Sequence, residues 1–325
     1  GFVLPDNQQI LKDIFIPKGK DRSAKNLDKV VAEVYDYGHK NKKPEAKIVE
    51  ILGKSGDPGV DILSIAKSYG LSTEFEKDLL NEAKKVSIQD IGSEYDKRAD
   101  LRDEITVTID SEDAKDLDDA VSLSFNGTNY VLGVHIADVS HYIKEKSILD
   151  KEALRRGTSV YLVDRVIPMF PEAISNGCCS LNSGEDKLAL SCIMEINDKG
   201  KVVSHKIVES VINVNMRMAY SDVAEILEKN SVETHPLYTE FYGLLKDMEK
   251  LAAILRKKRE ARGSIDFDIP ESKISLDKNG KVIDVKAYQR NVATNIIEEF
   301  MLITNETVAQ EYFWLELPFV YRVHD

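Results

Sequence analysis

The chain has 325 residues, which is enough for two domains, and 42% of them are hydrophobic, as in ordinary globular proteins. No apolar run approaches the roughly 18 residues that a membrane span needs, and no secretory segment opens the chain, so neither a membrane protein nor an exported one is expected. The net charge of −12 argues against a broadly basic nucleic-acid-binding surface, although bound cations and an uneven distribution of charge can offset that objection.

The three cysteines also limit the class of protein. Cys178 and Cys179 are adjacent and Cys192 stands alone, so they form neither a multi-disulfide framework nor a CxxC zinc motif. A reducing, cytoplasmic location is the simplest interpretation.

The N-terminal segment, residues 1–53, is expected to contain four short strands. Short strands with aromatic residues such as Phe2 and Phe15 are typical of a small OB-type or cold-shock β-barrel, whose faces bind single strands by stacking. Alternatively, these two aromatic residues belong to the core. The strands are predicted at 1–6, 13–17, 29–34 and 46–52.

Residues 54–99 are predicted to form a helical linker, with a helix at 61–69 and another at 74–86. From residue 100 onward, strand and helix patterns mix, so the whole chain is predicted to be α+β, with a mixed α/β domain over 100–325. Its strands are predicted at 105–109, 120–125, 129–137, 189–196 and 202–214. Its helices are predicted near 147–156 and 220–228, from Phe241 to a stop near Gly263, and at 291–314.

Four aspartates lie on the connection between the first two strands of this domain: Asp110, Asp116, Asp118 and Asp119. Carboxylates held a few Å apart repel one another unless a cation neutralises them. Hard divalent ions prefer oxygen ligands, and such a site can activate water and hold a phosphate during hydrolysis. The spacing therefore suggests a Mg²⁺ site.

The four aspartates have two other interpretations. A solvated acidic turn remains open, because charge clusters commonly face water. A calcium loop of the helix-loop-helix type needs glycine at its sixth position and glutamate at its twelfth. Counted from Asp110, Lys115 and Val121 occupy these positions, so that type of loop is excluded.

Several blocks resemble the RNase II/RNase R family of RNB-domain 3′→5′ exoribonucleases, and ribonuclease R in particular. They occur in order over more than two hundred residues, which makes the resemblance specific. They are Arg98–Asp103, Thr108–Asp110 with Asp116–Ala120, Val134–Tyr142, Thr158–Tyr161 with Ile167–Met169, Arg262–Phe267, Ile297–Met301 and Pro318–His324. Residues 1–53 resemble part of a second cold-shock domain of that family, with the barrel incomplete.

The resemblance implies hydrolysis of single-stranded RNA from its 3′ end to nucleoside 5′-monophosphates, with Mg²⁺ as cofactor and Mn²⁺ as a possible substitute. It assigns all four aspartates to the catalytic centre. We expect Asp110, Asp116 and Asp119 as direct or water-mediated ligands, with Asp118 as an outer-shell or second-metal residue.

The resemblance also implies contacts to RNA. Tyr161 would stack on or orient the terminal nucleotide, and Phe267 would be its stacking partner. Tyr220 and Glu298 would contact the ribose, which would select RNA over DNA. His135 lies in an alternating apolar strand, so we expect it to be packed and hydrogen-bonded rather than catalytic.

The sequence departs from the family pattern in one respect. The later family motif of the type Gly-Ser-Pro-Ile-Arg-Arg-Tyr is not found, nor are an S1 domain and a first cold-shock domain. We therefore expect a fragment that keeps the metal centre and has little or no exonuclease activity alone, because a lost phosphate-binding cation typically costs orders of magnitude in rate. A non-catalytic RNA-binding module that retains the acidic metal site is the alternative function, and an acidic scaffold without an RNA role is a third.

Overall fold

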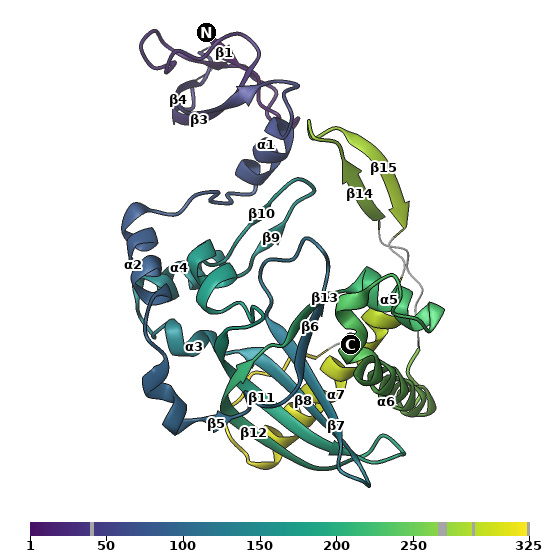
Figure 1. The fold of residues 1–325 in the computed structure, drawn as a ribbon. Coiled ribbons are helices and arrows are strands. Elements are labelled where there is room, and N and C mark those ends of the chain that lie inside the picture. The colour runs from purple at the N-terminus through teal and green to yellow at the C-terminus, as the bar shows by residue number, and fades with distance from the viewer. Residues whose placement is uncertain (40–41, 266–271, 288–289, 324–325) are drawn as a thin grey trace. The chain divides into compact units, whose positions relative to one another are not determined.

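The computed structural model describes residues 1–39, 42–265, 272–287 and 290–323 (Figure 1). The chain divides into two compact units. The smaller unit consists of residues 1–75, 153–169 and 271–287, and the larger unit consists of residues 76–152, 170–270 and 288–325.

The smaller unit contains a four-stranded sheet in the order β1-β2-β4-β3. Its core holds Ile14, Ile16, Ala46 and Ile48, all of them buried. The two longer strands pair in antiparallel fashion, whereas the first two strands are only two residues long, so the predictions at 1–6 and 13–17 were too long. The strands are β1 (Phe2–Val3), β2 (Ile14–Phe15), β3 (Asp28–Asp36) and β4 (Glu45–Lys54).

One helix and two hairpins complete this unit. Helix α1 (Val60–Ser68) follows Gly59, and the Arg165 guanidinium donates to the Gly59 carbonyl oxygen at 3.2 Å. Arg165 lies between the two strands of the first hairpin. The hairpins are β9 (Val160–Tyr161) with β10 (Val166–Ile167), and β14 (Ser272–Leu276) with β15 (Val282–Ala287). Neither hairpin was predicted.

The larger unit is built on a seven-stranded sheet in the order β13-β6-β7-β8-β11-β12-β5. Neighbouring strands are antiparallel except at the two edges, where β13 pairs with β6 and β5 pairs with β12 in parallel. The central strands confirm the predicted pattern to within a few residues. They are β5 (Ala99–Asp100), β6 (Thr106–Asp110), β7 (Asp119–Phe125), β8 (Tyr130–Ala137), β11 (Asp186–Ile196), β12 (Val202–Asn213) and β13 (Met216–Ala219).

Three helices supply the apolar core that packs with this sheet: α5 (Tyr220–Lys229), α6 (Tyr242–Ala261) and α7 (Val292–Trp314). Alternate residues of the central strands, such as Val107 and Ile109 on β6, join this core because side chains along a strand alternate between its two faces. Figure 1 shows α6 and α7 near the sheet in this unit.

The remaining elements of the chain are short. Helix α2 begins at Lys77 rather than at the predicted Glu74, because Glu76 is still extended. The six-residue π-helix η2 was not predicted. These elements are α2 (Lys77–Ser87), η1 (Gly92–Lys97), α3 (Val139–Tyr142), α4 (Ile148–Arg156), η2 (Ala173–Cys178) and η3 (Pro236–Phe241).

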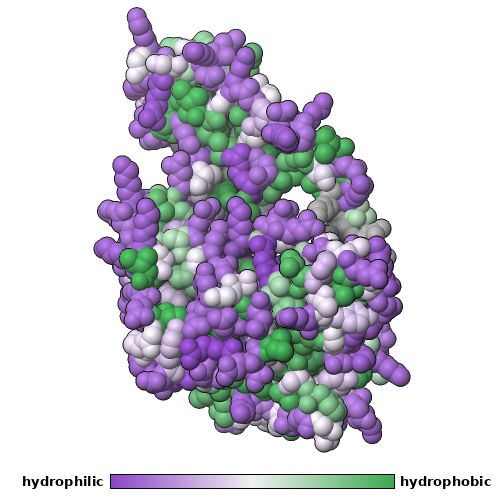
Figure 2. Space-filling model, in the orientation of Figure 1, coloured by the Kyte–Doolittle hydropathy of each residue, from purple (hydrophilic) through white to green (hydrophobic). Residues whose placement is uncertain are grey.

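The outer surface is mixed in polarity. Hydrophilic residues cover most of the face drawn in Figure 2, and hydrophobic residues appear on it in separate patches. Among the described residues, no helix is both long and apolar enough to span a lipid bilayer.

Candidate metal centre

The acidic loop, residues 111–118, connects β6 to β7 in the larger unit. Asp110 is the last residue of β6 and Asp119 is the first residue of β7. Because these strands are antiparallel neighbours, the last residue of β6 and the first residue of β7 lie at the same end of the strand pair. The fold therefore brings both aspartates to the two ends of one loop, with Asp116 and Asp118 on it.

Hydrogen bonds hold the second half of this loop in place. Leu117 is 1% exposed, its N–H donates to Ser180 Oγ at 3.0 Å, and its carbonyl accepts from the Leu181 N–H at 2.8 Å. Ser180 Oγ also donates to the Lys115 carbonyl at 3.1 Å, and the Asp118 carbonyl accepts from the Ala137 N–H at 2.9 Å. The aspartates thus project from a backbone with fixed partners.

Asp110 lies in an environment that disfavours its charge. Burial raises the pKa of Asp110 to about 7, the negative charge of Asp119 adds to this effect, and the positive charge of Arg217 opposes it. Its Oδ2 atom is buried and has no hydrogen-bond partner. An oxygen in this state is destabilising unless a proton or a cation satisfies it.

The neighbouring aspartates show the same trend. Asp118 is an exposed residue, yet loss of water around its carboxyl group and the charges of Asp116 and Asp119 raise its pKa to about 6. Burial also raises the pKa of Asp119. The like-charge effects show that the four predicted residues lie close enough to share one electrostatic field.

The donor set suits a hard cation, because all four side chains offer carboxylate oxygens. The unsatisfied Oδ2 atom of Asp110 is an oxygen that such a cation would satisfy. Across residues 1–39, 42–265, 272–287 and 290–323, however, no three His, Cys, Asp or Glu side chains are grouped around one point as ligands. The loop and the two strand ends that flank it therefore offer the oxygen donors that a hard cation needs.

His135 takes part in a buried polar chain. Its Nε2 atom lies 3.1 Å from Ser122 Oγ, its Nδ1 atom lies 2.7 Å from Ser191 Oγ, and Ser191 Oγ lies 2.6 Å from Ser210 Oγ. A Cβ atom at Gly133 would collide with Ser122 and with the imidazole, so this position needs glycine. Burial lowers the pKa of His135 to about 4, and the ring stays neutral. The structure confirms a packed, hydrogen-bonded imidazole.

The predicted RNA contacts are distributed over both units. In the smaller unit, Tyr161 lies on β9 with 68% of its surface exposed. In the larger unit, Tyr220 is the first residue of α5 and Glu298 lies in the second turn of α7, and both are half-buried. Phe267 falls outside the described residues. Within the larger unit, Asp110 pairs with Ala219, which directly precedes Tyr220. Tyr220 is therefore close to the acidic loop along the sheet edge.

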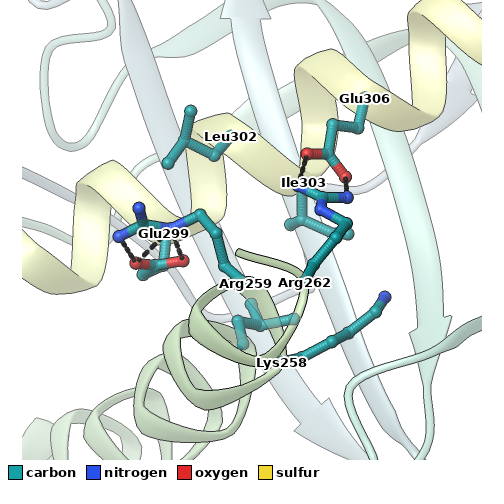
Figure 3. Close-up of a pocket in the computed structure, with 8 residues that line it drawn as sticks. Lys258, Arg259, Arg262, Glu299, Leu302, Ile303 and Glu306 are labelled. Atoms are coloured by element: carbon teal, nitrogen blue, oxygen red, sulfur yellow. Dashed lines mark hydrogen bonds and ion pairs between the residues drawn. The ribbon is translucent and has the colours of Figure 1, made fainter. Parts of the chain in front are cut away.

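A second concentration of charge lies in the groove between α6 and α7 (Figure 3). Arg259 donates to Glu299 Oε1 from Nη2 at 2.6 Å and from Nε at 3.1 Å, and Arg262 binds both Glu306 oxygens at 2.5 and 3.0 Å. The cavity between them holds only about 20 Å³, close to the space of one water molecule. The groove joins two helices and is too small for a substrate.

Sequence reasoning missed two residues that shape the acidic loop, Arg217 and Ser180. Both act on main-chain atoms of residues far away in the chain, and no spacing rule reveals such contacts. Ser180 is the second residue after the end of the π-helix η2, an element that is frequently found at functional sites.

Comparison with known families adds to this geometry. The RNB domain family matches residues 98–325, and the cold shock domain family matches residues 2–76. The chain belongs to the RNB-domain family. Its α+β architecture, with cold-shock strands followed by an RNB domain, is the one predicted, and the acidic loop lies in the RNB domain.

Named relatives agree with this membership. "Ribonuclease R" of Thermotoga maritima is 46% identical over 330 residues, which cover 100% of this chain and 46% of that protein. The chain thus spans about half the length of this curated relative. The structure of Mycoplasma genitalium RNase R in complex with ribose methylated single-stranded RNA matches 96% of this chain and 48% of that one, with a TM-score of 0.89 and 28% identity.

A more distant match limits what the fold alone can establish. Yeast Ssd1, described as a pseudonuclease, superposes with a TM-score of 0.69 over 97% of this chain and 40% of that one, at 17% identity. This match shows a shared fold, and a shared fold does not by itself establish an activity.

Proposed function

We propose that this chain carries the catalytic aspartates of a Mg²⁺-dependent 3′→5′ exoribonuclease that hydrolyses single-stranded RNA to nucleoside 5′-monophosphates. The observation that supports this most is the presence of all four aspartates in an RNB domain, where burial raises the pKa of Asp110, Asp118 and Asp119 and like charges add to the effect at the first two. A protein that only binds RNA has no need of such an unfavourable cluster.

In this proposal Asp110, Asp116 and Asp119 hold Mg²⁺, with Mn²⁺ as a possible substitute, and Asp118 acts as an outer-shell or second-metal residue. The bound ion would polarise the scissile phosphate and lower the pKa of an attacking water. The chain's own contribution is to hold the carboxylates where β6 ends and β7 begins. The hydrogen bonds at Leu117 and Asp118 fix the backbone of the second half of the loop.

The 3′-terminal nucleotide would be bound by aromatic and polar side chains. We assign base stacking to Tyr161 and Phe267 and contact with the ribose to Tyr220 and Glu298, which would exclude DNA. The exposed ring of Tyr161 supports its role, since stacking needs an accessible face. The RNase R complex with ribose methylated single-stranded RNA supports RNA as the ligand class.

We further propose three segments: a partial cold-shock domain over 1–53, a helical linker over 54–99 and the RNB catalytic portion over 100–325. A cytoplasmic location agrees with Cys178, Cys179 and Cys192, which are all free thiols.

The test compares Asp118→Asn with Asp113→Asn. Both remove one negative charge from the same loop, but Asp113 is exposed and not among the four aspartates. The experiment uses the longest chain that carries these residues. It measures hydrolysis of a 3′-tailed RNA in Mg²⁺ and binding of the same RNA without Mg²⁺. We expect Asp118→Asn to abolish hydrolysis while binding persists, and Asp113→Asn to change neither. Equal loss of hydrolysis and binding in Asp118→Asn would contradict the catalytic assignment.

The second candidate is an RNA-binding module without catalysis, which the pseudonuclease fold of Ssd1 makes a specific alternative. It predicts RNA binding by the wild-type chain and no metal-dependent hydrolysis in any chain that carries the four aspartates.

A further inference from the structure

Arg217 reaches the acidic loop from β13, the edge strand beside β6. In the parallel pairing of these strands, Arg217 lies opposite Thr108 and Ala219 lies opposite Asp110. The Nη2 atom of Arg217 donates to two main-chain carbonyl oxygens of the loop, those of Glu112 at 3.0 Å and Ala114 at 2.6 Å. One guanidinium nitrogen thus bridges two peptide groups that are two residues apart.

Both acceptors belong to a tight turn. The Ala114 N–H donates to the Ser111 carbonyl at 3.1 Å, which closes the turn at the start of the acidic loop. Ser221, on α5, adds a bond from its Oγ atom to Glu112 Oε1 at 2.7 Å. This first half of the loop is therefore held by β13 and α5, as the second half is held by Ser180.

The partners of Arg217 are unexpected for a cation beside so many carboxylates. Among the described residues Arg217 forms no ion pair, and its hydrogen bonds go to neutral carbonyls. Charge-assisted hydrogen bonds of this kind are stronger than bonds between neutral groups, and they fix the direction of the peptide planes that they bind. The guanidinium is used to shape the backbone, while its charge acts on Asp110 only through space.

We propose that Arg217 is a positioning residue for the acidic loop. It holds residues 111–114 so that the loop delivers Asp116, Asp118 and Asp119 beside Asp110. The consequence for metal binding rests on the proposed function, whereas the anchoring of the loop does not.

Charge and positioning predict opposite results when Arg217 is replaced. A positive charge beside a cation site repels the cation, so its removal alone would tighten cation binding. Loss of the bridge would instead let the loop move, and residues that orient metal ligands typically contribute about 10- to 100-fold to metal affinity. The direction of the change therefore separates the two roles.

The experiment uses the metal-free 325-residue chain with Arg217→Met, which keeps much of the side-chain length without charge, and Arg217→Lys, which keeps the charge. Arg256→Met is the matched control, because Arg256 lies on α6 in the same unit and pairs with Glu260 at 3.0 Å. Amide hydrogen exchange over residues 111–117 reports on the loop without any metal. The affinity for Mn²⁺ is measured from the electron paramagnetic resonance signal of the free ion.

We expect Arg217→Met to speed exchange in the loop and to weaken Mn²⁺ binding about tenfold or more. Arg217→Lys should recover part of both effects, and Arg256→Met should change neither. Unchanged exchange in Arg217→Met, or Mn²⁺ binding as tight as in the wild type or tighter, would overturn the proposal. A wild-type chain with a protected loop and no affinity for Mn²⁺ would defeat the proposed function instead, and the exchange data would still decide the role of Arg217.

Discussion

Carboxylates gather in two regions of the larger unit, and the pKa shifts of Glu306 in one region and of Asp110 in the other have opposite directions. In the groove between α6 and α7, Glu299 and Glu306 each accept hydrogen bonds from two nitrogen atoms of one arginine. A hydrogen bond from Arg262 lowers the pKa of Glu306. At the acidic loop, Arg217 donates to main-chain carbonyls, and burial raises the pKa of Asp110, which directly precedes the loop, to about 7.

The comparison separates carboxylates that stabilise the fold from carboxylates that can bind a ligand. A carboxylate with its own arginine stabilises the fold and has little left to offer a ligand. Buried carboxylates that face one another destabilise the folded state, and a cation that neutralises them regains that free energy as binding. Substitutions in the two regions should therefore have opposite effects on stability and on function.

The largest expected effect is that of Asp119→Asn on RNA hydrolysis. Loss of one metal-binding carboxylate should lower the rate about a hundredfold or more. The urea midpoint of the metal-free chain should not fall, because burial already disfavours the charge of Asp119. Initial rates on a 3′-tailed RNA, measured on the same longest chain as in the Asp118→Asn test, and urea unfolding of the metal-free 325-residue chain check the two parts. A variant that loses activity only because it unfolds would contradict the comparison.

The next effect is that of Glu299→Gln on stability. Glu299 is 4% exposed, and the change removes the carboxylate that accepts from Nε and Nη2 of Arg259. Breaking such a pair typically costs about 3 kcal/mol. Urea unfolding followed by circular dichroism measures the cost. A cost below about 1 kcal/mol, which is typical of surface ion pairs, would show that the pair between Arg259 and Glu299 does little to stabilise the fold.

A smaller effect concerns pH. Because the folded-state pKa of Asp110 is raised to about 7 from 3.8, the folded chain takes up a proton before the unfolded chain does, and its stability should rise as pH falls through about 7. In EDTA, the stability gained by Asp110→Asn over the wild type should be greatest above pH 7 and shrink toward pH 5. A gain that is constant with pH would contradict the raised pKa.

The smallest effect is that of Glu306→Gln. Its pair with Arg262 is exposed on both sides, so the expected loss is about 1 kcal/mol or less. The folded-state pKa of Glu306 is lowered, so its stabilising contribution is complete above its ordinary value of 4.5 and is lost as pH falls below that value. Urea midpoints at pH 7 and pH 4, measured beside Glu299→Gln, check the size and the direction.

The sequence was informative where local patterns carry the structure. The strands β7 and β8 were predicted because apolar and polar residues alternate and because Asn126-Gly127 marks their turn. The acidic loop was identified because its aspartates lie within ten residues of one another. In both cases the relevant physical interactions are short-range along the chain.

Other parts of the fold depend on distant partners. Arg217 binds carbonyls more than a hundred residues away, at Glu112 and Ala114, and no local pattern predicts such bonds. The strands β9 and β10 are two residues long, too short for a period of two to be visible. The electrostatics of Asp110 likewise depend on burial, which only the folded structure reveals.

The glycine at position 133 has a consequence for how the chain tolerates acid. It admits the imidazole of His135 into a site where the ring cannot take up a proton until the pH reaches about 4, whereas the ordinary value is 6.5. Between pH 6.5 and pH 4, His135 is protonated in the unfolded chain but not in the folded chain, so a fall in pH over this range favours unfolding. Mild acidification thus relieves repulsion among the aspartates while it penalises the buried ring. Between about pH 6.5 and 4 the protonation of His135 in the unfolded chain should therefore offset the stability that Asp110 gains by taking up a proton in the folded chain.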